Sequence, residues 1–234
     1  MTSIWPTLCL SASYYAIVRF LGPWYMKNRE PFELKKVMLV YNLFQAIFNS
    51  WLLYKAGLLW FGPYNWRCQP IDYSNSSAGE AALNVTYWYF ISKFLDFFDS
   101  FFFVLRKKFS HLSTLHVVHH GGLPIFVWFG PRFVGGGHTT FCGFLNSGIH
   151  VVMYLYYFLA ALGPKVTPYL WWKRYLTKLQ MIQFVVFFIH ALQPLFIECD
   201  YPKIYCWIIL GHGLLYFVLF TNFYIQSYIK KKKA

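Results

Sequence analysis

The sequence predicts an all-α polytopic membrane protein with seven transmembrane helices. Its 234 residues are 58% hydrophobic and 24% aromatic, and only 12% are charged, whereas soluble domains carry about a quarter charged residues. Seven apolar runs approach or exceed the length of a membrane-spanning helix, about 20 residues. We expect spans at residues 7–24, 37–57, 85–105, 114–129, 139–162, 171–196 and 205–228, which together form one domain over residues 1–234.

Polar segments separate the first three spans. The first span ends at Gly22-Pro23, and the charged turn 27–36 follows it. The second span carries three amide side chains that are three and four residues apart. They share one helix face, which we interpret as packing contacts with other helices. These amides are Asn42, Gln45 and Asn49. The long polar loop 58–82 comes next, and its glycosylation sequons at Asn75 and Asn84 give weak support for a lumenal position.

The third and fourth spans carry two sets of chemically active side chains. Ionisable groups at membrane depth are costly, and they persist mainly where they line a polar cavity or do chemistry. The 3.6-residue period confines each set to one side of its helix, so each can project into a shared volume. The sets are Lys93, Asp96, Asp99 and Ser100 on the third span, and His116, His119 and His120 on the fourth.

The last three spans carry further polar positions. The fifth span has one continuous helical face, because its polar and aromatic residues are spaced by four, three and four. That face comprises Asn146, His150, Met153 and Tyr157, with Tyr154 beside it. On the sixth span we interpret Gln180 and Gln183 as cavity lining or as supporting contacts, and His190 as a continuation of that lining. His111, His138 and His212 are interpreted as structural.

The distribution of basic residues predicts the orientation. Fifteen of the 21 Lys and Arg residues fall on one side, in the turn 27–36, the turn 106–108, the region 165–178 and the C-terminal tail. The positive-inside rule then places the C-terminus in the cytosol and the loop 58–82 in the lumen. The net charge of +13 is thereby explained by topology and needs no nucleic-acid partner.

In this orientation a basic mouth lies over an apolar interior. The histidines of the fourth span lie just inside the cytosolic face, and five cations lie near them. Cations at such a mouth suit an acyl chain carried on a phosphate-rich head group such as coenzyme A. The five are Arg106, Lys107, Lys108, Lys173 and Arg174.

Four motifs in register resemble those of the ELO fatty-acid elongases. They are Lys93-x-x-Asp96-x-x-Asp99-Ser100 with Arg106-Lys107-Lys108, His116-x-x-His119-His120, Asn146-x-x-x-His150-x-x-Met153-Tyr154-x-Tyr156-Tyr157, and Thr177-x-x-Gln180-x-x-Gln183. Their order and spacing agree across nearly the whole chain. Two positions depart from the family pattern, because Asp96 replaces the usual Glu and Ser100 the usual Thr. Each keeps the functional group.

The resemblance implies an endoplasmic-reticulum enzyme that condenses a long-chain acyl-CoA with malonyl-CoA. The products are CO₂, CoA and a 3-oxoacyl-CoA two carbons longer. It also implies an acyl tunnel with the active site towards the cytosolic side, and no cofactor or metal. Homo-oligomers and other elongation-cycle enzymes are the protein partners it suggests. Among the histidines it favours His119 as the nucleophile. We then expect His150, which shares a helix face with Asn146, to assist decarboxylation or to hold the enolate.

Alternatives remain beside this reading. Any one buried histidine is by default structural, and only the clustering of four favours catalysis. The Lys93, Asp96 and Asp99 set is equally well explained as a structural ion-pair network or as a direct participant. A di-iron desaturase also uses His-x-x-His-His, and a seven-helix receptor or transporter would have the same number of spans.

Two further expectations concern the ends of the spans. Oxidising conditions in the lumen favour a disulfide between Cys68 and Cys199, and the resemblance implies that pairing. Cys9, Cys142 and Cys206 are expected within spans. Lys231 and Lys232 resemble a cytosolic dilysine retrieval signal, although a charge run that sets topology explains them equally well.

Overall fold

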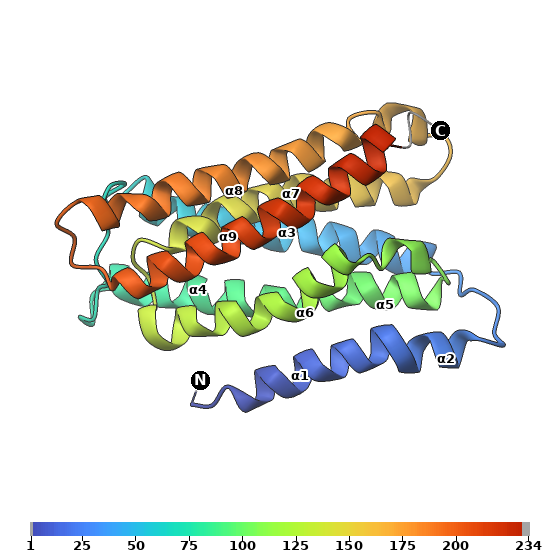
Figure 1. Cartoon of the computed structure of the whole chain (residues 1–234), viewed down its shortest axis with the longest axis horizontal. Coiled ribbons are helices and arrows are strands. Elements are labelled where there is room, and N and C mark those ends of the chain that lie inside the picture. The colour runs from blue at the N-terminus through green and yellow to red at the C-terminus, as the bar shows by residue number, and fades with distance from the viewer. Residues whose placement is uncertain (1, 231–234) are drawn as a thin grey trace.

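The computed structural model describes residues 2–230, and over them the chain is all-helical, without strands. Its helices run side by side in an elongated bundle, with α1 at one edge (Figure 1). In chain order the elements are α1 (Trp5–Ala16), η1 (Ile17–Leu21), α2 (Gly22–Met26), α3 (Lys35–Trp60), α4 (Ser77–Leu95), α5 (Phe97–Leu105), η2 (Phe109–His111), α6 (Thr114–Phe129), η3 (Gly130–Val134), α7 (Thr140–Leu162), η4 (Thr167–Leu170), α8 (Lys173–Phe196), α9 (Lys203–Tyr224) and η5 (Ile225–Ile229).

Four helical stretches are long and apolar enough to cross a bilayer, which makes the chain a multi-pass membrane protein. They are Lys35–Trp60, Thr140–Leu162, Thr167–Phe196 and Lys203–Ile229. The other three predicted spans are helical but are divided between elements. Proline lacks the backbone N–H that a helix interior needs, and Pro23 follows the π-helical η1. The third predicted span is divided at Asp96 into α4 and α5, and α6 passes into the π-helical η3 at Gly130.

The predicted loop 58–82 is shorter in the structure. Helix α3 ends at Trp60 and helix α4 begins at Ser77, eight residues before the predicted start of the third span at 85, so the loop covers 61–76. The Ser76 side chain caps the helix by accepting the Gly79 N–H at 2.9 Å, an interaction typical of helix N-termini. The first two turns are helical although they contain Glu80 and Asn84, whose polarity excluded them from the apolar run.

Helix pairs build the bundle. Helix α3 packs along α7, α8 along α9, and α1 against α6. Close contact between α1 and α6 depends on Gly121, because a Cβ atom there would lie 2.6 Å from the Tyr15 ring and 3.1 Å from the Tyr14 ring. The α3–α7 pair encloses an aromatic core that includes Trp60 and Phe141.

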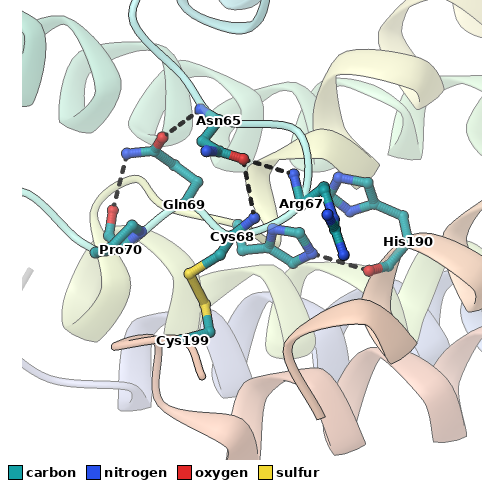
Figure 2. Close-up of a disulfide and its surroundings, with 8 residues drawn as sticks. Asn65, Arg67, Cys68, Gln69, Pro70, His190 and Cys199 are labelled. Atoms are coloured by element: carbon teal, nitrogen blue, oxygen red, sulfur yellow. Dashed lines mark hydrogen bonds between the residues drawn. A yellow bond between two sulfur atoms is a disulfide. The ribbon is translucent and has the colours of Figure 1, made fainter. Parts of the chain in front are cut away.

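A disulfide closes the end of the bundle that carries the loop 61–76. Cys68 is bonded to Cys199, with Cα atoms 5.6 Å apart, and so ties this loop to the connection between α8 and α9 (Figure 2). Beneath the loop, His138 contacts the His190 carbonyl at 2.8 Å and the two rings stack at 3.9 Å. Cys9, Cys142 and Cys206 are free thiols. Lys231 and Lys232 lie outside the described residues.

Candidate active site

A buried ion pair lies in the site, on the third predicted span. The Lys93 ammonium lies 3.3 Å from Asp96 Oδ2, and the two residues are only 1% and 2% exposed. Lys93 also donates to Asn146 Oδ1 at 3.3 Å and lies over the Tyr89 ring. A buried charge is tolerated when it is paired and its remaining hydrogen-bonding groups are satisfied. Lys93 and Asp96 lie on one side of their helix, as the helical period predicted, and Lys93 reaches α7 through Asn146.

Asp96 and Asp99 share one phenol. The Tyr154 hydroxyl lies 2.8 Å from Asp96 Oδ1 and 2.8 Å from Asp99 Oδ2. A tyrosine hydroxyl has a single proton to donate, so one of the two contacts needs a proton from the carboxyl side. Gln45 donates to the same Asp96 oxygen at 3.0 Å. Because Asp96 also faces Lys93, we assign the charged form to Asp96 and the protonated form to Asp99. We use the name carboxylate network for the five residues Gln45, Lys93, Asp96, Asp99 and Tyr154.

The three histidines of α6 adopt different environments. His116 Nε2 contacts Ser100 Oγ at 2.8 Å, and Ser100 contacts the Tyr14 hydroxyl at 2.8 Å. His120 lies against His116, with ring centroids 4.2 Å apart. His119 points elsewhere, because its ring meets the Tyr216 ring of α9 at 4.8 Å. Helix α6 begins with the Ser113 side chain accepting the His116 N–H, which fixes the start of this turn.

The residues predicted on α7 lie against the carboxylate network. His150 Nδ1 is 3.9 Å from Asp96 Oδ2 and has no hydrogen-bond partner among the described residues. Asn146 accepts from Tyr89 at 2.9 Å and contacts Gln183 at 3.4 Å. Gln180 lies 3.6 Å from the Met153 sulfur. Gln183 is thus a supporting contact of Asn146.

A mostly apolar cavity begins at this site. His119, Asn146 and Tyr89 line one end of it, whereas His116 and His120 do not line it. The cavity continues between the helices to Trp60 and Tyr205, close to the disulfide-bonded end. His190 was expected to line it and does not. Its ring is instead packed between His138 and Phe141, because the aromatic core around Trp60 fills that stripe of α8.

The predicted cations lie at the opposite end of the bundle from the disulfide. Lys108, Lys173 and Arg174 are exposed, and Arg106 and Lys107 are half-buried. His111 reports their proximity, since partial burial together with the charges of Lys173, Lys108 and Arg106 lowers its pKa below the ordinary value. The turn after α5 and the start of α8 therefore bring their positive charges together.

Sequence reasoning assigned no site role to several residues that the structure places in or beside the site. Gln45 was interpreted as a packing amide, but it contacts Asp96, Tyr41 and Tyr154. Its spacing with Asn42 and Asn49 was the available signal. His212 was interpreted as structural, but it lines the cavity. The tyrosines gave no signal, because aromatic residues are abundant throughout the spans. They are Tyr14, Tyr89 and Tyr216.

Comparison with known proteins decides between the alternatives. The model of the GNS1/SUR4 family, ELO, matches residues 1–234. This chain belongs to the ELO family. It is 50% identical to "Very long chain fatty acid elongase AAEL008004" of Aedes aegypti, over 100% of this chain and 66% of the relative. It is 49% identical to "Very long chain fatty acid elongase 7" of Drosophila melanogaster, over 99% of this chain and 71% of the relative.

The vertebrate relatives agree. The chain is 42% identical to "Very long chain fatty acid elongase 4" of Homo sapiens, over 100% of this chain and 74% of the relative. The chain thus spans about two thirds to three quarters of the length of these ELO proteins. Within residues 2–230, no three His, Cys, Asp or Glu side chains are arranged to hold a metal ion. Membership of the ELO family favours the elongase over the desaturase.

Proposed function

We propose that this ELO protein is a fatty-acid elongase, which condenses a long-chain acyl-CoA with malonyl-CoA. The products are a 3-oxoacyl-CoA two carbons longer, CO₂ and CoA. Similarity over at least 99% of this chain to proteins named very long chain fatty acid elongases supports the reaction. The geometric observation that carries it is the position of His119, which lies where an apolar cavity meets the polar residues Asn146 and Tyr89.

The first step is acyl transfer to His119. Its neutral imidazole attacks the thioester carbonyl carbon, the carbon–sulfur bond breaks, and CoA leaves as the thiol after taking the imidazole proton. An imidazole can form such covalent intermediates. His119 is suited to this role because it faces the cavity, whereas His116 is hydrogen-bonded to Ser100 and His120 stacks on His116.

The second step uses malonyl-CoA. Loss of CO₂ leaves an enolate, whose carbon attacks the acyl carbonyl and displaces His119 as an imidazolate, which takes up one proton from solvent to restore the neutral imidazole. Donors near the enolate oxygen stabilise it. Lys93, the Asn146 amide and His150 are the groups available. Asp96 contacts Lys93 and lies beside His150, and Lys93 in turn donates to Asn146. The reaction as written needs no metal or cofactor.

The proposal includes the orientation of the protein in the membrane. All seven predicted spans cross the bilayer of the endoplasmic reticulum, with the C-terminus in the cytosol and the disulfide in the lumen. The cavity from His119 towards Trp60 is the acyl tunnel. The CoA phosphates bind at the cytosolic mouth, where Arg106, Lys108 and Lys173 converge around His111, because clustered cations favour phosphate groups.

A single-turnover experiment tests the covalent step. Purified protein is mixed with acyl-CoA in the absence of malonyl-CoA, and intact mass and released CoA are measured. Wild type should gain one acyl group on His119 and release one CoA. His119→Ala should do neither. His150→Ala is the matched control, because it removes an imidazole from the same site and leaves the nucleophile, so it should still acylate.

Two outcomes would contradict the proposal at different levels. If wild type elongates a ladder of acyl-CoAs with labelled malonyl-CoA but never retains an acyl group, direct condensation replaces the covalent mechanism. If it elongates no acyl-CoA, the proposed activity itself fails.

A further inference from the structure

One imidazole on the wall of the cavity has no role in the condensation proposed above. His212 of α9 lines the cavity, and its ring packs edge-on against Phe126 at 4.3 Å and Tyr216 at 4.5 Å. Its Nδ1 atom is buried and has no hydrogen-bond partner within residues 2–230. An imidazole in an apolar wall is costly unless its hydrogen-bonding capacity is used.

Four hydroxyl groups of this wall contrast with His212, because each has a hydrogen-bond partner within the protein. The hydroxyls of Thr86, Ser147 and Thr140 each donate to a backbone carbonyl of their own segment. The Thr139 hydroxyl bonds to Tyr201. Trp60 Nε1 also lacks a partner, but aromatic rings enclose it at the far end of the cavity. They belong to Tyr64, Trp66, Phe141 and His190.

The position of His212 defines which part of a bound chain it would meet. Tyr216 contacts His119, and His212 precedes it by four residues, about 6 Å or one turn along α9. Tyr205, Ile208 and Ile209 line the cavity deeper still. An extended acyl chain advances about 1.2 Å per bond, the same advance per bond as an extended peptide backbone, which spans about 3.3–3.6 Å over the three bonds of a residue. A chain attached at His119 would therefore pass His212 about five bonds from its carbonyl carbon.

We propose that His212 is a specificity-determining residue that selects acyl chains carrying a hydroxyl group near carbon 6. The hydroxyl would donate to one imidazole nitrogen or accept from the other, which satisfies the side chain that the protein leaves unpaired. A site built to hydrogen-bond a hydroxyl discriminates against the chain that lacks it, because the polar group is then left buried and unpaired. This inference rests on the proposed elongase function.

The test is a competition between CoA esters of one chain length. The esters are unsubstituted or carry one hydroxyl at carbon 2, 4, 6, 8 or 12, and elongation is followed with labelled malonyl-CoA. Wild type should prefer a hydroxyl at carbons 4 to 8 over none by about tenfold in kcat/KM, with no preference for carbon 12. His212→Leu should lose this peak, and His212→Asn should keep part of it. Leu214→Ala, on the exposed face of α9, should keep all of it.

The outcomes separate this inference from the function on which it rests. Wild type that elongates all the esters equally overturns the inference alone, and so does a preference that survives in His212→Leu. If none of the esters is elongated, the proposed function fails, and the inference fails with it. Should His212→Leu not fold, the position dependence in wild type together with His212→Asn still decides.

Discussion

Replacing the two aspartates of the carboxylate network by asparagine should have very different effects on stability. In Asp96→Asn, the Lys93 ammonium loses the carboxylate 3.3 Å away while remaining about 1% exposed. Breaking a buried pair by removing one partner costs about 3–5 kcal/mol. Asp99→Asn instead resembles the protonated acid, since its amide can donate to the Tyr154 hydroxyl, and we expect a change within about 1 kcal/mol.

The assay is thermal and denaturant unfolding of each variant in the same detergent. Asp96→Asn should lower the midpoint temperature by about 10 °C, whereas Asp99→Asn should remain near wild type. Adding Lys93→Met to Asp96→Asn should recover part of the loss, because the unpaired charge is then gone. The effects of Lys93→Met and Asp96→Asn on the free energy of unfolding should therefore be non-additive by about 2 kcal/mol. Equal destabilisation by the two asparagine variants, or strict additivity, would refute the assigned charge states.

Two further predictions concern the packing of the bundle. Cys68→Ser with Cys199→Ser opens a loop of sequence separation 131 and should lower the free energy of unfolding by up to about 5 kcal/mol by the chain-entropy relation, and by less in practice because the membrane already restricts the unfolded chain. Thermal unfolding measures this loss, with Cys9→Ser, which changes an exposed free thiol, as the control. Equal unfolding midpoints in the two variants would show that the disulfide contributes nothing. Gly121→Ala should destabilise the α1–α6 contact by about 1–3 kcal/mol, because its Cβ would meet the Tyr15 ring at 2.6 Å, whereas Gly122→Ala has only an ordinary contact at 3.6 Å and should unfold at or above the wild-type temperature.

Helical periodicity was sufficient to predict which polar side chains share a helix face. The third predicted span carries Lys93, Asp96 and Asp99 at spacings of three residues. Helix α7 carries Asn146, His150 and Tyr154 at spacings of four residues. Those spacings already place each set on one face, so only the pairing of the two faces remained unknown. Hydropathy predicted the long apolar helices, and it failed at α4, where the Ser76 cap extends the helix into polar sequence.

Contacts between segments far apart in the chain could not be predicted, because spacing gives the face of a helix but not its neighbour. Gln45 reaches Asp96 across a separation of 51 residues, and Tyr14 reaches Ser100 across 86. His190 and His212 show the same limit in opposite directions. Both lie on apolar helices, yet His190 is stacked in the aromatic core while His212 lines the cavity. Which histidine faces the cavity is set by what packs beside it, and for His212 the packing leaves the Nδ1 atom without a hydrogen-bond partner within residues 2–230.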